Sequence, residues 1–175
     1  TLLLSSVAAL GAAIGSPKAA IAGTTSFECG VSDSGLLTTY AIRSDGNHKP
    51  VIRWVSHHFS WGGYTPQQRC YEVSGRMNRL YQQGRLNGFT SGWLNGQPVI
   101  CSSSYCSSDT LLFTLRPDQN PWAVLAEVTG AAVGASSPSW QTVQDTEGVG
   151  SIDLEGLLEN QETETPVESV ESPES

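Results

Sequence analysis

Short stretches of alternating apolar and polar residues occupy the middle of the chain. They predict β-strands, because successive side chains of a strand point to opposite faces. In the first stretch Phe27 and Cys29 share a face, and in the last Leu111, Phe113 and Leu115 point toward the core. Six strands are predicted in this way, over residues 26–31, 36–43, 51–56, 86–94, 98–101 and 110–116.

After Thr65 the apolar residues recur every three to four positions, which predicts an α-helix. Thr65 is a suitable N-cap, Pro66 fits the first helical position, and Gly84 supplies the stop signal. Gly75 lies inside the helix, where it costs about 1 kcal/mol relative to Ala, so we expect a strand to approach closely there. The predicted buried face consists of Cys70, Val73, Met77 and Leu80.

A second, shorter helix is predicted to start at Asn120 and Pro121 and to end at Gly130. The strands are joined by short turns such as Asn95-Gly96, and short turns make neighbouring strands antiparallel. The expected fold class is therefore α+β, with an antiparallel sheet of about five or six strands and two helices packed on one face. We expect disulfides to stabilise it.

Composition divides the chain into three parts. Residues 1–22 are small and apolar and end in Ala20-Ile21-Ala22, which is typical of a secretory signal peptide, here with a truncated start. An uncleaved membrane anchor is the alternative. Residues 23–131 are predicted to form the folded domain. Residues 132–175 are rich in Glu, Thr, Ser and Pro and are predicted to form a disordered acidic tail. We therefore expect an exported protein.

Negative charge is concentrated at the C-terminal end of the chain. The formal net charge is −8, and residues 141–175 carry ten acidic side chains and no basic one. Residues 24–140 carry eight basic and seven acidic side chains, which excludes an electrostatic nucleic-acid interface. Four arginines close together in sequence are interpreted as the solvated side of the helix. They are Arg69, Arg76, Arg79 and Arg85.

The four cysteines suit an oxidising compartment and predict two disulfides. Of the three possible connectivities we favour Cys29–Cys70 with Cys101–Cys106. The first pair joins a strand to the helix that must pack on it, and the second flanks a Ser-rich turn. The cysteine spacing does not fit a zinc site, so no metal is expected.

The aromatic, glycine-containing segment between the third strand and the helix is the candidate binding site. Exposed aromatic loops serve ligand and partner surfaces, and packing of this loop over the core is the alternative. His57 and His58 are adjacent and would point to opposite faces of a continuing strand, so they do not form a metal site together. No catalytic or cofactor motif occurs, and we do not expect an enzyme. The candidate binding residues are Trp54, His57, Phe59, Trp61 and Tyr64.

One apolar segment interrupts the acidic tail. Leu154, Leu157 and Leu158 recur at helical spacing within it. A helix this short is not stable alone. We therefore consider it a docking helix for a partner, with a wholly disordered tail as the alternative.

Three motifs in the folded part occur together: Thr65-Pro66-Gln67-Gln68-Arg69-Cys70, then Pro98-Val99-Ile100-Cys101, and then Cys106. Together with Phe27-x-Cys29, this combination resembles the circadian oscillating protein family of cyanobacteria over roughly residues 27–128. The resemblance implies an exported or membrane-associated protein whose abundance follows the day, and we expect it in the periplasm or the thylakoid lumen. It implies no catalytic residue, because the family has no assigned activity.

The expected function is that of a non-catalytic extracytoplasmic binding module. Its partner would be another protein or a membrane surface, reached through the aromatic loop or the acidic tail. We expect no nucleic acid and no cofactor, and the sequence identifies no small-molecule ligand. One alternative is a small hydrolase that uses His57 or His58. Another is a carbohydrate-binding, peptide-binding or inhibitor domain that uses Trp61 and Tyr64.

Overall fold

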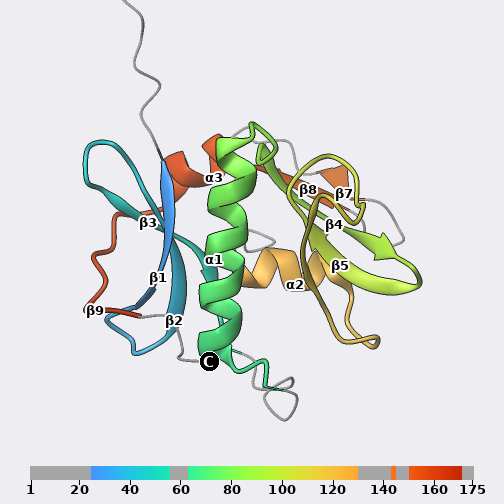
Figure 1. Cartoon of the computed structure of the whole chain (residues 1–175), viewed down its shortest axis with the longest axis horizontal. Coiled ribbons are helices and arrows are strands. Elements are labelled where there is room, and N and C mark those ends of the chain that lie inside the picture. Colours follow the sequence, from blue (N-terminus) through green and yellow to red (C-terminus); the bar gives the residue numbers. More distant parts are fainter. Residues whose placement is uncertain (1–24, 56–62, 130–142, 145–149, 171–175) are drawn as a thin grey trace, which may run out of the picture.

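The computed structural model describes residues 25–55, 63–129, 143–144 and 150–170. These residues form two antiparallel sheets and three helices (Figure 1). The strands are β1 (Ser26–Val31), β2 (Leu37–Ile42), β3 (His48–Arg53), β4 (Gly88–Leu94), β5 (Gln97–Cys101), β6 (Leu111–Thr114), β7 (Val143–Gln144), β8 (Gly150–Asp153) and β9 (Glu168–Ser169). The helices are α1 (Pro66–Gln82), α2 (Pro121–Val128) and α3 (Leu154–Asn160).

The predicted α+β class is confirmed, but the strands divide between two sheets. Sheet A has the order β3-β2-β1-β9, and sheet B has the order β6-β5-β4-β8-β7. All six predicted strands are present, and the first has the predicted bounds. The additional strands β7, β8 and β9 come from the segment that was predicted to be a tail.

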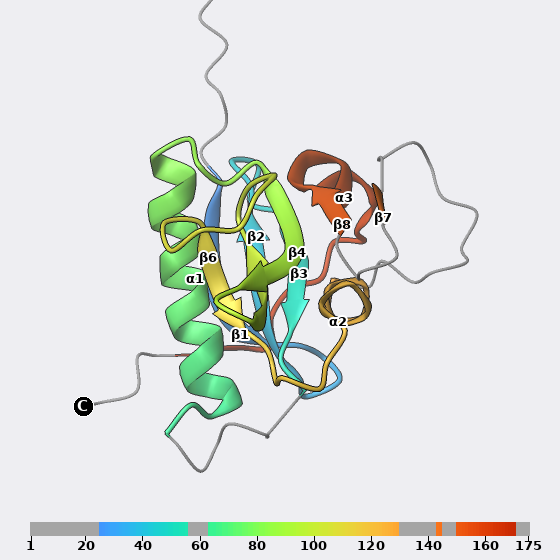
Figure 2. The ribbon, with the colours of Figure 1, turned by 90° about the vertical axis from the view of Figure 1, so that its right-hand side faces the viewer.

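The helices cover both sides of the strands and not one side as predicted. Figure 2 shows α1 on one side and α2 and α3 on the other. In β2, Thr38, Thr39, Tyr40 and Ala41 are all buried. Thr39 contacts Ser74 of α1, and Tyr40 on the opposite face donates a hydrogen bond to Glu164 in the segment after α3, so both faces of this strand are covered.

Helix α1 has the predicted ends and the predicted buried face. The Thr65 side chain accepts a hydrogen bond from the backbone N–H of Gln68 (3.1 Å), and Pro66 occupies the first turn. Gly84 follows the helix with a φ of 66°, in the left-handed region that favours glycine. The residues of its buried face are Pro66, Cys70, Val73, Ser74, Met77 and Leu80.

The core face predicted for strand β6 and the residue after it is right for Leu115, which is buried, but it misses Leu112. Leu112 is fully buried, whereas Leu111 and Phe113 are only partly buried. The pairing of β5 with β6 shifts between Ile100 and Cys101. Such a bulge interrupts strict alternation, and it leaves Leu112 as the residue that enters the core.

The predicted disordered tail is wrong for residues 150–170. Strand β8 pairs with β4 inside sheet B, from Gly88 opposite Asp153 to Ser91 opposite Gly150. The Asp153 side chain then caps α3 by accepting a hydrogen bond from the Gly156 N–H (2.7 Å). The ordered domain therefore extends well beyond the predicted boundary at residue 131.

Residues 161–170 run along sheet A, and we call them the C-terminal strap. Its N–H groups donate to the carbonyl groups of neighbouring strands: Glu164 to His48 (2.9 Å), Val167 to Val31 (2.9 Å) and Val170 to Cys29 (3.1 Å). Within the strap, β9 pairs with the outer edge of β1. An unpaired edge is a template for association with other chains, and the strap covers this one.

Candidate functional site

Trp54, a predicted binding residue, lies in the core. It is 5% exposed, and its indole Nε1 donates a hydrogen bond to Thr39 Oγ1 (2.9 Å). Its ring meets the Phe113 ring edge-on, with the centroids 5.2 Å apart. The Arg69 guanidinium lies 5.4 Å from the indole centroid, and burial lowers the pKa of Arg69. The prediction is wrong for Trp54, because a buried ring with a satisfied N–H serves packing.

The other predicted aromatic residues divide into two groups. His57, Phe59 and Trp61 lie outside the described residues, so their roles stay predictions. Tyr64 is 54% exposed and directly precedes the N-cap of α1. The carbohydrate- or peptide-binding alternative needs the rings of both Trp61 and Tyr64 to be fully exposed, so it stays a prediction.

The three leucines predicted to dock on a partner dock on their own domain. Leu154, Leu157 and Leu158 are 2%, 2% and 0% exposed, and α3 packs against β3, β4 and β8. A helix of seven residues is stabilised only by such packing. Because the core takes up the whole apolar face, the docking prediction is wrong.

A groove of about 610 Å³ separates α1 from the outer edge of β1, with the end of the strap at its rim. Two connections hold the helix to the strand. One is the Cys29–Cys70 disulfide, with its Cα atoms 5.6 Å apart. The other is Asn78, whose side chain accepts a hydrogen bond from the Phe27 N–H and donates one to the Phe27 carbonyl, both at 2.7 Å. The groove therefore has rigid walls, and its volume is typical of ligand sites.

The helical wall of the groove has a gap in the middle. Tyr71, Gly75 and Arg79 follow at intervals of four residues and so share one face of α1. A Cβ atom added to Gly75 would meet nothing within 4 Å. The predicted close approach of a strand to Gly75 is therefore wrong, and this glycine keeps open a space that no described residue fills.

Charges of both signs line the groove, on Glu28, Glu72, Arg76 and Arg79. The Glu72 carboxylate accepts a hydrogen bond from the Gln68 amide (2.6 Å). The Arg76 guanidinium donates to the Leu112 carbonyl. Arg79 forms no side-chain hydrogen bond or ion pair within the described residues. Its charge is therefore available to a ligand.

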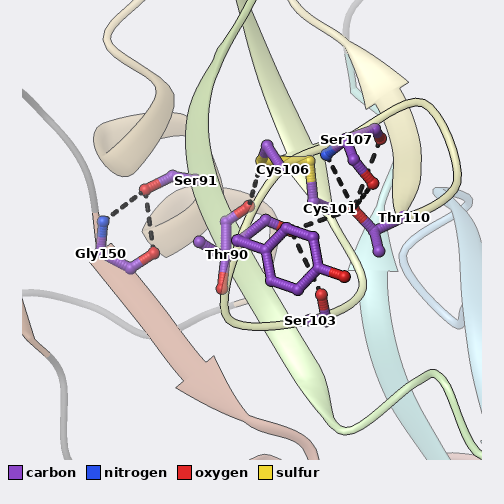
Figure 3. Close-up of a disulfide and its surroundings, with 9 residues drawn as sticks. Thr90, Ser91, Cys101, Ser103, Cys106, Ser107, Thr110 and Gly150 are labelled. Carbon is purple, nitrogen blue, oxygen red and sulfur yellow. Dashed lines mark hydrogen bonds between the residues drawn. A yellow bond between two sulfur atoms is a disulfide. The ribbon is translucent and has the colours of Figure 1, made fainter.

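The second disulfide, Cys101–Cys106, is part of a closely bonded loop and not of the groove (Figure 3). Thr110 Oγ1 accepts a hydrogen bond from the Ser107 N–H (2.9 Å) and donates one to the Tyr105 carbonyl (3.0 Å). On the neighbouring strand, the Ser91 hydroxyl accepts from the Gly150 N–H (2.8 Å). Both predicted disulfides are present, and this one fixes a turn beside sheet B.

The described residues contain no metal cluster and no catalytic histidine arrangement. No group of three or more His, Cys, Asp or Glu side chains in these parts of the chain is placed to hold a metal ion. His48 is the one histidine described, and its ring lies edge-on to Tyr40 at 6.3 Å. His57 and His58 fall outside, so the hydrolase alternative stays a prediction. Within the same residues, no helix combines the length and apolarity needed to cross a bilayer.

The groove was missed by sequence reasoning, because its rim comes from a segment 90 positions or more after its helical wall in the chain. Ser169 and Val170 were assigned to a disordered tail, yet they form the rim beside Tyr71 and Gly75. One local signal was present: a glycine inside an otherwise regular helix, four residues after a tyrosine and four before an arginine.

A family model described as circadian oscillating protein COP23 matches residues 26–159. No curated protein and no solved structure matches. The matched range begins at β1, takes in both sheets apart from β9, and ends within α3, before the strap.

Proposed function

This chain belongs to the circadian oscillating protein COP23 family, and from that premise we propose that it is a non-catalytic, exported module that binds a segment of another protein. The binding site is the groove between α1 and β1. The observation that carries this proposal is Gly75, which lowers helix stability and satisfies no internal packing need. A partner that enters the groove would occupy the space that the absence of a side chain at Gly75 leaves open.

The rigidity of the groove supports the proposal. A disulfide and the paired hydrogen bonds of Asn78 hold its two walls, so little conformational entropy is lost when a ligand enters. Tyr71 is 41% exposed beside the gap and offers an apolar ring with a polar end. Tyrosines of this kind are frequent anchors at protein interfaces.

Export is part of the proposal. Two disulfides are characteristic of proteins in oxidising compartments, and residues 1–22 have the composition of a signal peptide. We place the module in the periplasm or the thylakoid lumen. In keeping with the family description, its abundance follows the day, so the amount of partner that it holds would follow the day as well.

The test is affinity capture from the exported protein fraction with the immobilised full chain. Gly75→Leu fills the gap with a side chain and is compared with Gln67→Leu, which adds the same side chain at an exposed position of α1 outside the groove. We expect partners to be retained by the natural chain and by Gln67→Leu. Retention by Gly75→Leu should fall by about tenfold, which corresponds to about 1.4 kcal/mol.

Stability measurements distinguish lost binding from lost folding. Leucine is more favourable than glycine inside a helix by nearly 1 kcal/mol, so the Gly75→Leu variant should melt at the same temperature as the natural chain or above it. The same partners captured by all three proteins would overturn the proposal. Turnover of a substrate by the full chain that disappears in His57→Ala or His58→Ala would replace it with the hydrolase alternative.

A further inference from the structure

Arg76 and Arg79 of α1 differ in their neighbours from the arginines outside this helix. Four arginines elsewhere lie within ion-pair distance of carboxylates: Arg43 with Glu155, Arg53 with Glu164, Arg85 with Asp109 and Arg116 with Asp118, at 3.4, 3.3, 3.9 and 3.3 Å. Lys49 donates to the Gln161 carbonyl (2.6 Å). Arg76 bonds only a neutral carbonyl, and Arg79 has no side-chain partner within the described residues. Arg76 and Arg79 are therefore two neighbouring arginines for which the described residues supply no carboxylate within ion-pair distance.

Arg76 and Arg79 also lie where two hollows meet. They line the groove beside β1, where Glu28 and Glu72 carry the opposite charge, and they line a second hollow of about 430 Å³ together with Arg85 and Asp109, where positive charge is in excess. Three guanidinium groups border the second hollow against one carboxylate. We call Arg76 and Arg79, with the hollow on either side, the arginine saddle. A ligand longer than either hollow can cross α1 over it.

We propose that the arginine saddle binds an acidic segment of a partner protein, with two or more Asp or Glu side chains, laid across α1. This inference rests on the proposed function and specifies the chemistry of the partner. A guanidinium group matches a carboxylate with two parallel hydrogen bonds, and such charged bonds are about twice as strong as neutral ones.

The molecule already shows this mode of recognition within itself. The strap carries Glu164, whose carboxylate accepts hydrogen bonds from Arg53 (3.3 Å) and from Tyr40 (3.1 Å) while its backbone pairs with a strand. An acidic extended segment is thus held on sheet A by basic side chains and backbone bonds. The saddle offers the same charge to a segment that comes from outside.

The net charge favours a short acidic segment over an anionic membrane as the occupant. The chain carries a formal net charge of −8, so a wide anionic surface repels most of it. A peptide reaches only the local field at Arg76 and Arg79, over distances shorter than the Debye length of about 8 Å at physiological salt.

Peptide binding by the full chain tests the inference. The probes are a fluorescently labelled twelve-residue peptide with glutamate at alternating positions and its glutamine counterpart. We expect the glutamate peptide to bind about tenfold more tightly, and salt to weaken its binding. Arg79→Gln should weaken it about fivefold or more, whereas Arg116→Gln, which removes an arginine that lines neither hollow, should leave it unchanged.

Equal affinity for the two peptides, or unchanged binding by Arg79→Gln, would overturn the inference. Full competition by inorganic phosphate at similar affinity would also overturn it, because it would reveal a small-anion site. The inference would also be overturned if the full chain sedimented with phosphatidylglycerol vesicles in a manner that depends on Arg79 but did not bind the glutamate peptide. Native capture that depends on Gly75 but not on Arg79 would overturn this inference alone, and capture that depends on neither would overturn the proposed function as well.

Discussion

At the scale of single residues, Tyr40 joins the strap to sheet A. Its hydroxyl donates to Glu164, which also pairs with Arg53. Burial, and then the Glu164 charge, raise the pKa of Tyr40 from 10.0 to about 12. The phenol is therefore kept protonated as a donor, and its contribution belongs to the folded state only.

This pKa predicts an alkaline loss of stability. Because the folded state holds the Tyr40 proton more tightly than the unfolded state, the stabilisation is complete below about pH 10 and is lost as the pH rises toward about 12. One pKa unit corresponds to about 1.4 kcal/mol, so the free energy of unfolding should fall by roughly 2 kcal/mol between about pH 9 and pH 11.5.

Urea unfolding of the natural chain and of Tyr40→Phe at several pH values measures this effect. The phenylalanine variant retains the other tyrosines and lacks the titrating group at position 40. The stability difference between the two proteins should therefore shrink as the pH rises. A difference that is constant over this range would show that the Tyr40 proton is not held by the fold.

At the scale of secondary-structure elements, the local sequence predicted that a helix or strand is present better than it predicted which other elements the helix or strand packs against. Helix α1 begins and ends where its cap residues indicate, because capping is completed within a few positions of the chain. Helix α3 was recognised from its leucine spacing, but its position in the fold was not predicted. What decided the place was the β8 strand before it, which pairs with β4 and directs the leucines inward.

The burial of α3 predicts a large effect of a single truncation. Leu158→Ala should lower the free energy of unfolding by about 2 to 5 kcal/mol, because it removes methyl groups from a fully buried site. Val167→Ala is the matched control in the strap, since Val167 is exposed, and it should change stability by less than about 0.5 kcal/mol. Chemical denaturation of the full-length variants measures both. If both substitutions changed the free energy of unfolding by equally small amounts, α3 would be only loosely attached to the domain.

At the scale of the whole molecule, the strap protects sheet A from association. Its backbone N–H groups donate hydrogen bonds to the carbonyls of Cys29 and Val31. The Asn78 side chain bonds the backbone N–H and carbonyl of Phe27 on the same edge. The ion pair of Glu164 with Arg53 adds to this attachment. The edge of β1 is thus covered along its length by two elements from different parts of the chain.

Removal of the strap should expose this edge. We expect a chain that ends after residue 160 to form dimers or larger species at concentrations at which the full chain is monomeric, as judged by light scattering during size-exclusion chromatography. A chain that lacks only residues 171–175 is the control and should behave like the full chain. If the shorter chain stays monomeric with unchanged melting, another feature protects the edge.

The sequence by itself determined what depends on neighbours along the chain. The strands of residues 26–116, the caps and buried face of α1, and the favoured cysteine pairs all follow from periodicity, turn residues and spacing. The family resemblance was also present in these motifs and is confirmed by the match over residues 26–159.

Tertiary structure decided what depends on residues far apart in sequence. The hydrogen bonds between Phe27 and Asn78 span 51 positions, and those between Ser91 and Gly150 span 59. By composition alone, residues 150–170 appeared too polar to be ordered. They are ordered because strand pairing supplies backbone hydrogen bonds, which composition does not reveal. The groove beside Gly75 exists only once that segment is in place, since its rim, its strand wall and its helix come from three separate parts of the chain.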